Sequence, residues 1–151
     1  MAAKILVVDD EPSIVKLVTA TLEGRGYQVI TAHDGQEAII EAKLHKPDLI
    51  LLDVMMPHMD GTEARKRLLS DPVTKDIPVI HLTAVGDFDQ QREALADGAT
   101  DYIVKPFTPS DLANVVGDML DPKKREAMAK DKAAKSAHLR AITDIMHRDR
   151  G

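Results

Sequence analysis

Short apolar runs alternate regularly along the chain with longer segments whose apolar residues recur at helical spacing. Runs rich in Val, Ile and Leu indicate strands, whereas apolar positions separated by three and four residues indicate amphipathic helices. The predicted strands are residues 4–8, 27–32, 48–53, 77–83 and 101–105, and the predicted helices are residues 12–26, 35–45, 62–70, 88–98 and 109–120. The pattern therefore predicts five strand–helix units in one domain.

The composition of the predicted strands indicates how they pack. Three of them contain the uninterrupted apolar runs ILVV, LILL and PVIHL. Such runs are typical of a parallel sheet with helices on both faces, because both sides of each strand are then buried. Pro12 suits the first turn of a helix, and Asp34–Gly35 and Asp60–Gly61 mark two further helix starts. We therefore predict an α/β fold with a doubly wound, parallel five-stranded sheet.

The composition changes after residue 121. Asp121 and Pro122 suit the N-cap and the first position of a helix, and the stretch behind them is rich in Ala, Lys, Glu and Met. We predict one domain over residues 1–121 and a basic, Ala/Lys-rich helical extension over residues 122–151, either a projecting helix or a connector. An apolar stripe in the extension leaves open a docking surface or a homodimer, and a solvated helix is the alternative.

The net charge of −5 conceals an asymmetry along the chain. Residues 121–151 hold 9 Lys and Arg against 5 Asp and Glu, whereas the residues before them hold 11 against 20, which gives +4 and −9. An acidic main domain would repel nucleic-acid phosphates, so we expect it not to bind nucleic acid directly. The absence of cysteine excludes disulfides and thiol chemistry. Because we find neither a leader-like segment nor an apolar run of 18 residues, we expect a cytoplasmic protein that does not contact a membrane.

Polar side chains stand at the carboxyl ends of four predicted strands. They are Asp9 and Asp10, Asp53, Thr83 and Lys105. In a doubly wound sheet the ligand binds beyond these strand ends, so we expect the five side chains to converge. Clustered carboxylates repel one another unless a hard divalent cation joins them, and Mg2+ keeps coordination positions for phosphate oxygens. A carboxylate nucleophile that forms an aspartyl phosphate fits this arrangement, with Lys105 as a positive charge and Thr83 as a hydroxyl donor.

Four motifs occur in the order and at the spacing of a known family. They are Asp-Asp at 9–10, D-x-x-M-P-x-M-D-G at 53–61, Thr-Ala at 83–84 and D-Y-x-x-K-P-F at 101–107. Over residues 4 to about 120 the chain resembles the response-regulator receiver domains of bacterial two-component signalling, including the chemotaxis regulators. The resemblance implies a flavodoxin-like strand order, 2-1-3-4-5, and a phosphorylation-activated switch rather than an enzyme that turns over a metabolite.

The resemblance also implies how the switch is loaded. Asp53 would accept a phosphoryl group from a sensor histidine kinase or a histidine phosphotransfer protein, in a reaction that needs Mg2+, and would later lose it by autodephosphorylation. Asp53, Asp10 and the backbone carbonyl of Met55 would bind Mg2+ directly, and Asp9 would act through a water molecule.

The remaining implied roles concern the response to phosphorylation. Lys105 would pair with the phosphoryl group, Thr83 would move towards it, and Tyr102 would follow inward. The surface formed by the fourth helix, fifth strand and fifth helix would then change and control a downstream protein target. The Lys105–Pro106 peptide bond is implied to be cis.

Three other functions share parts of this pattern. A phosphatase of the haloacid-dehalogenase type also uses an Asp nucleophile and Mg2+, but it needs a second Asp where Met55 stands. An FMN-binding flavodoxin would need a Ser/Thr/Gly phosphate loop after the first strand, where this chain has an acidic segment. A receiver-like interaction module that is never phosphorylated remains the alternative, although none of the required acids, Thr or Lys is missing. His81, inside an apolar run, is interpreted as a packed or hydrogen-bonded histidine rather than a ligand.

Overall fold

The fold is that of a five-stranded parallel sheet between two layers of helices. The computed structural model describes residues 2–54, 56, 59–84, 101–121 and 123–124. The elements in chain order are β1 (Lys4–Val8), α1 (Pro12–Gly24), β2 (Gln28–Ala32), α2 (Gly35–His45), β3 (Leu49–Asp53), α3 (Gly61–Ser70), β4 (Val79–Ala84), β5 (Asp101–Lys105) and α5 (Pro109–Leu120). The strand order β2-β1-β3-β4-β5 confirms the predicted fold class and order.

Two sequence predictions fall largely outside this description. The helix expected over residues 88–98 lies outside the described residues, and so does the extension expected over residues 122–151, apart from Lys123 and Lys124. The Asp121 carboxylate accepts a hydrogen bond from the backbone N–H of Lys123 at 3.0 Å, which is the kind of bond that an N-cap residue makes.

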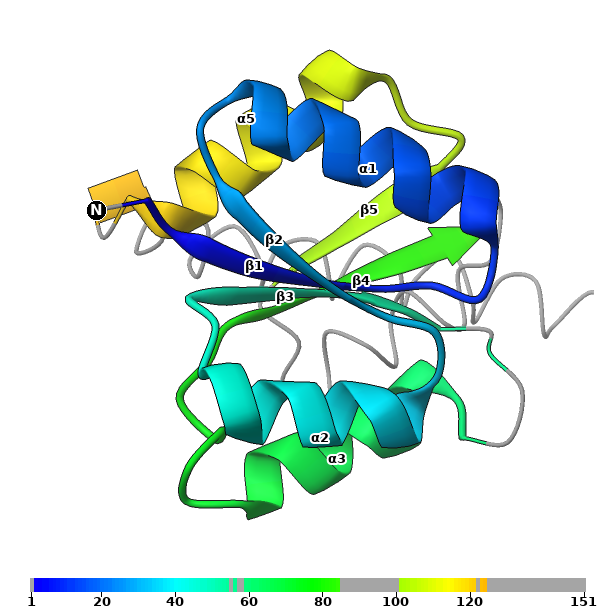
Figure 1. Ribbon diagram of the computed structural model, residues 1–151, viewed down its shortest axis with the longest axis vertical. Helices are drawn as coiled ribbons and strands as arrows, with labels where there is room; N and C mark the ends of the chain where they lie inside the picture. The colour runs from blue at the N-terminus through cyan, green and yellow to red at the C-terminus, as the bar shows by residue number, and fades with distance from the viewer. Residues whose placement is uncertain (1, 55, 57–58, 85–100, 122, 125–151) are drawn as a thin grey trace, which may run out of the picture.

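The helices cover the two faces of the sheet in pairs. Helices α1 and α5 lie on one face, and α2 and α3 lie on the other (Figure 1). Successive strand residues point to opposite faces, so Ile5 and Val7 join the core under α1 and α5, whereas Leu6 and Val8 join the core under α2 and α3. This double covering explains why the central strands β1, β3 and β4 are mostly apolar on both faces.

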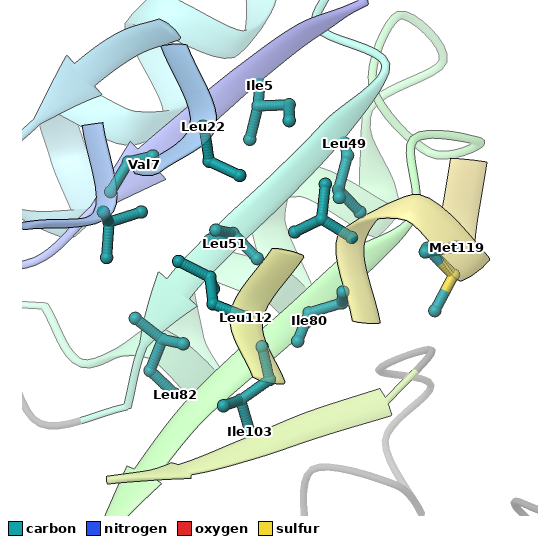
Figure 2. Packing of buried hydrophobic residues seen from close by; sticks show 12 residues of the cluster. Ile5, Val7, Leu22, Leu49, Leu51, Ile80, Leu82, Ile103, Leu112 and Met119 are labelled. Atoms are coloured by element: carbon teal, nitrogen blue, oxygen red, sulfur yellow. The ribbon is translucent and has the colours of Figure 1, made fainter. Parts of the chain in front are cut away.

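The core under α1 and α5 holds the central strands against both helices. Leu22 of α1 and Leu112 of α5 are fully buried against side chains from the sheet, among them Leu51 and Leu82 (Figure 2). Burial of each large aliphatic side chain stabilises the fold by about 1.5–3 kcal/mol. The strand ends that follow these residues are therefore held on a rigid base.

Local signals fix where the helices begin and end. The carboxylates of Asp34 and Asp60 each accept a hydrogen bond of 2.8 Å from the backbone N–H three residues later, which confirms the two predicted helix starts. Helix α1 ends at Gly24, two residues before the predicted end, because Gly26 has φ of 90° and Tyr27 donates its N–H back to the Leu22 carbonyl.

Candidate active site

Three carboxylates converge where the first and third strands end. Strands β1 and β3 are parallel neighbours whose register pairs Val8 with Leu52, so Asp9 and Asp53 follow at the same level. Carboxylate oxygens of Asp9, Asp10 and Asp53 all lie within 4.8 Å of one another. Asp9 is fully buried and Asp53 is 4% exposed, whereas Asp10 faces solvent.

Lys105 is the last residue of β5, the outer strand beyond β4, and its side chain extends to the carboxylate cluster. Its Nζ lies 2.8 Å from Oδ2 of Asp9 and 3.4 Å from Oδ1 of Asp53. Burial alone would lower the pKa of Lys105, but the hydrogen bond to Asp9 and the charges of Asp53 and Asp9 outweigh burial. The pKa therefore lies above its ordinary value, and the ammonium group is charged.

The charges within the cluster do not balance. Among the described residues, three carboxylates face the ammonium group of Lys105, so a divalent cation would neutralise the remaining negative charge. Asp9 already uses both oxygens, because Oδ1 accepts the N–H of Glu11 at 3.0 Å and Oδ2 accepts Lys105. Within the described part of the chain Asp10 has no hydrogen-bond or ion-pair partner. The oxygen donors are of the kind that Mg2+ prefers.

The fourth strand supplies a buried hydroxyl group. Thr83 follows Leu82, which the register pairs with Asp53, and its side chain is 1% exposed. Its Oγ1 has no hydrogen-bond partner among the residues that the structure describes. Thr83 therefore places a hydroxyl group that can donate a hydrogen bond near the carboxyl end of β4.

The loop after β3 returns against the backbone of Asp53. Gly61 donates its N–H to the Val54 carbonyl at 2.9 Å, and a Cβ atom at Gly61 would collide with the carbonyl oxygen of Asp53. Only glycine therefore allows α3 to start this close to the end of β3. Met55, expected to contribute a backbone carbonyl, lies outside the described residues.

Two expected residues are placed by their backbone. Tyr102 lies in β5 opposite His81, and its side chain is outside the description, so its role stays a prediction. The peptide bond between Lys105 and Pro106 is cis, the conformation that the sequence resemblance implies.

A buried polar pair beside the site was not predicted. His81 and Arg65 are both fully buried, and Nη1 of Arg65 lies 2.8 Å from Nε2 of His81. This confirms that His81 is a hydrogen-bonded core residue. The sequence did contain a signal for Arg65, because it falls on the same helical face as the buried residues Gly61 and Leu68.

The tautomer of His81 follows from its partner. A guanidinium group can only donate hydrogen bonds, so Nε2 must be the acceptor and the ring proton must lie on Nδ1. Burial, with a further contribution from the positive charge of Arg65, lowers the pKa of His81 to about 3. The ring is therefore neutral at neutral pH.

The fold and the site define a doubly wound α/β protein whose ligand edge, beyond the carboxyl ends of the strands, carries three carboxylates and a lysine. Residues 5–117 match the family model of the response regulator receiver domain, so the chain belongs to the response regulator receiver domain family. The chain is longer than this match and continues for residues 118–151. Receiver domains are phosphoacceptor regulators of two-component signalling rather than enzymes in the usual sense.

The chain is similar to bacterial regulators over this region. It is 48% identical over 112 residues to the alkaline phosphatase synthesis transcriptional regulatory protein PhoP of Bacillus subtilis, which covers 74% of this chain and 46% of PhoP. The chain spans about half the length of the first curated relatives it matches. What those whole proteins do therefore does not transfer directly to this chain.

Two solved structures are similar in fold and sequence. The chemotaxis response regulator CheY4 of Vibrio cholerae has a TM-score of 0.73 and 39% identity, covering 78% of this chain and 98% of CheY4. The receiver domain of the sensor histidine kinase PA1611 of Pseudomonas aeruginosa has a TM-score of 0.74 and 29% identity, covering 80% of this chain and 98% of that domain. In that structure a magnesium ion is coordinated in the active site cleft.

None of the helices in the described residues is long and apolar enough to cross a membrane.

Proposed function

We propose that the protein is a phosphorylation-activated signalling switch in which Asp53 accepts a phosphoryl group from the phosphohistidine of a sensor histidine kinase or a histidine phosphotransfer protein. The observation that carries the proposal is the environment of Asp53. This carboxylate lies at a strand end, next to Asp9 and Asp10, with the Lys105 ammonium 3.4 Å away. Membership of the receiver family supports the same assignment.

The residues present fit a bound Mg2+ ion. Asp10 and Asp53, together with the backbone carbonyl of Met55, would hold the ion directly, and Asp9 would contribute through water because Lys105 and Glu11 already occupy its oxygens. When bound, Mg2+ would supply positive charge that offsets the carboxylates and the phosphoryl oxygens. The magnesium ion in the PA1611 receiver domain supports this choice of metal.

The transfer step assigns a role to each remaining side chain. A carboxylate oxygen of Asp53 forms a bond to phosphorus while the P–N bond of the donor phosphohistidine breaks and its electron pair stays on the imidazole nitrogen. Lys105 stabilises the negative charge on the phosphoryl oxygens, and the Thr83 hydroxyl donates a hydrogen bond to one of them. Autodephosphorylation removes the group by hydrolysis: an oxygen of water bonds to phosphorus, the bond between phosphorus and the Asp53 carboxylate oxygen breaks, and inorganic phosphate and the free carboxylate are released.

The output of the switch is a change of surface. Movement of Thr83 towards the phosphoryl group, followed by Tyr102, would change the surface formed by the fourth helix, β5 and α5, which would contact a downstream protein target. Residues 1–121 would form the receiver, and residues 122–151 would form a helical extension that connects, docks or pairs two copies. The acidic receiver would not bind nucleic acid itself, and we place the protein in the cytoplasm, away from membranes.

The proposal is tested by intact mass. The protein is incubated with acetyl phosphate, with and without Mg2+, alongside an Asp53→Asn variant. We expect the parent to gain one phosphoryl group only with Mg2+ and the variant to gain none. A parent that gains no phosphoryl group would instead support the phosphorylation-independent interaction module.

A further inference from the structure

The Arg65–His81 hydrogen bond joins the two elements that flank the phosphoryl site. Arg65 belongs to α3 and His81 to β4, and both side chains are fully buried. The 2.8 Å contact donates from a charged guanidinium group to a neutral ring, and such charge-assisted hydrogen bonds are shorter and stronger than neutral ones. Burying a charged group and a polar ring carries a desolvation penalty that apolar residues at these core positions would avoid.

Helix α3 transmits this anchor to Asp53. Gly61 and Arg65 are four residues apart and therefore lie on the same side of the helix. At Gly61 the helix abuts the carbonyl of Asp53 so closely that no Cβ atom fits. A change in the spacing between α3 and β4 at Arg65 would therefore also change how closely the start of α3 packs against the backbone of Asp53.

Strand β4 transmits the same anchor to Thr83. His81 and Thr83 are two residues apart in the strand, so their side chains point to the same face. In the register His81 pairs with Leu52 and Leu82 pairs with Asp53. Asp53 and Thr83 therefore follow within one or two residues of the level at which Arg65 contacts His81. The Thr83 hydroxyl is buried without a partner among the described residues, so its position depends on the backbone that carries it.

We infer that the buried Arg65–His81 hydrogen bond is a positioning pair, which fixes α3 against β4 and thereby sets the distance between Asp53 and the Thr83 hydroxyl for phosphoryl transfer. The inference rests on the proposed function and assigns it two further residues. Neither residue is among those proposed to contact the phosphoryl group. Because misplacing a reacting group by about 1 Å can cost on the order of 100-fold in rate, a small shift of α3 against β4 would be enough to slow the reaction.

The test separates positioning from stability with a double substitution. Arg65→Met and His81→Leu are made singly and together, and each protein is measured for urea unfolding midpoint and for the rate of Mg2+-dependent phosphorylation by acetyl phosphate. Each single change removes the Arg65–His81 hydrogen bond but leaves the other polar group buried, which lowers the midpoint, whereas the double change replaces both by apolar groups and restores much of it. We expect the double variant to stay on the order of tenfold or more slower than the parent.

Two further variants complete the design. His81→Gln keeps an acceptor for Arg65 and should recover most of the parental rate. If the position needed only an apolar side chain, His81→Gln would be no faster than His81→Leu. Ile80→Val destabilises β4 from its opposite, α1/α5 face and should leave the rate unchanged, because it does not touch the pair.

The outcomes are distinct. A double variant that is both stable and as fast as the parent would overturn the inference alone, as would a His81→Gln variant no faster than His81→Leu. A parent that gains no phosphoryl group would overturn the proposed function, and with it this inference. A stable but slow double variant, with the rate recovered in His81→Gln, would establish the pair as positioning residues.

Discussion

The buried His81 ring should make the folding free energy depend on pH below neutrality. Burial, and then the charge of Arg65, lowers its pKa from 6.5 to about 3. As the pH falls below 6.5 the ring takes up a proton in the unfolded chain but not in the folded protein. The stability contributed by the neutral ring is complete above about pH 6.5 and is lost as the pH falls towards 3, at about 1.4 kcal/mol per pH unit.

Between about pH 7 and about pH 5 this loss amounts to about 2 kcal/mol, a large part of the stability of an ordinary domain. The assay is urea unfolding followed by far-ultraviolet circular dichroism, on the parent and on His81→Gln. The glutamine amide still accepts from Arg65 but does not titrate, so the parent should lose about 2 kcal/mol more than the variant on acidification.

A matched control removes the objection that any change in β4 alters the pH dependence. Ile80→Val lies next to His81 on the opposite face of the strand and should lower the stability by about 0.5–1.5 kcal/mol while keeping the pH dependence of the parent. Parallel pH dependences in the parent and His81→Gln would refute the assignment of a neutral, buried ring that accepts from Arg65.

Three further substitutions probe the site itself. Lys105→Met should slow phosphorylation by acetyl phosphate by about 100-fold or more. It should also tighten Mg2+ binding, measured in a titration followed by NMR, because it removes the positive charge beside the carboxylates. Weaker Mg2+ binding would contradict this. Gly61→Ala should lower the free energy of unfolding by about 1–3 kcal/mol, since its Cβ would collide with the Asp53 carbonyl, whereas Gly24→Ala, whose Cβ meets no atom within 4 Å, should not be destabilising. Thr83→Val removes a buried hydroxyl that has no partner among the described residues, so it should leave the unfolding free energy unchanged or raise it by up to about 1–2 kcal/mol, and should still weaken the response to phosphorylation. A clear loss of stability would show that the hydroxyl is paired.

The fold and most of the site could be predicted because both follow from strand topology. Asp9 and Lys105 are 96 residues apart, yet the rule that parallel strands end at one edge of the sheet predicts them on the same side of the molecule, and the structure places them 2.8 Å apart. The uninterrupted apolar runs likewise required helices on both faces, as Figure 1 shows.

The Arg65–His81 pair could not be predicted in the same way. Helical periodicity places Arg65 on the buried face, but a charged residue is usually read as solvent-facing, because burying a charge without a partner is costly. Its partner lies 16 residues away on another element, and side-chain pairing between a helix and a strand depends on how the two pack rather than on any sequence period. Met55 and the side chain of Tyr102 keep their roles as predictions.

The central claim, that Asp53 is the phosphoacceptor, is tested most directly by locating the acyl phosphate in the chain. The protein phosphorylated with acetyl phosphate and Mg2+ is treated with borohydride, which reduces an aspartyl phosphate to homoserine, and the converted residue is identified by peptide mass spectrometry. We predict homoserine at position 53 alone, and only in the sample that received both acetyl phosphate and Mg2+ before the borohydride. Conversion at Asp9 or Asp10, or at no position in a protein that has gained a phosphoryl group, would contradict the account.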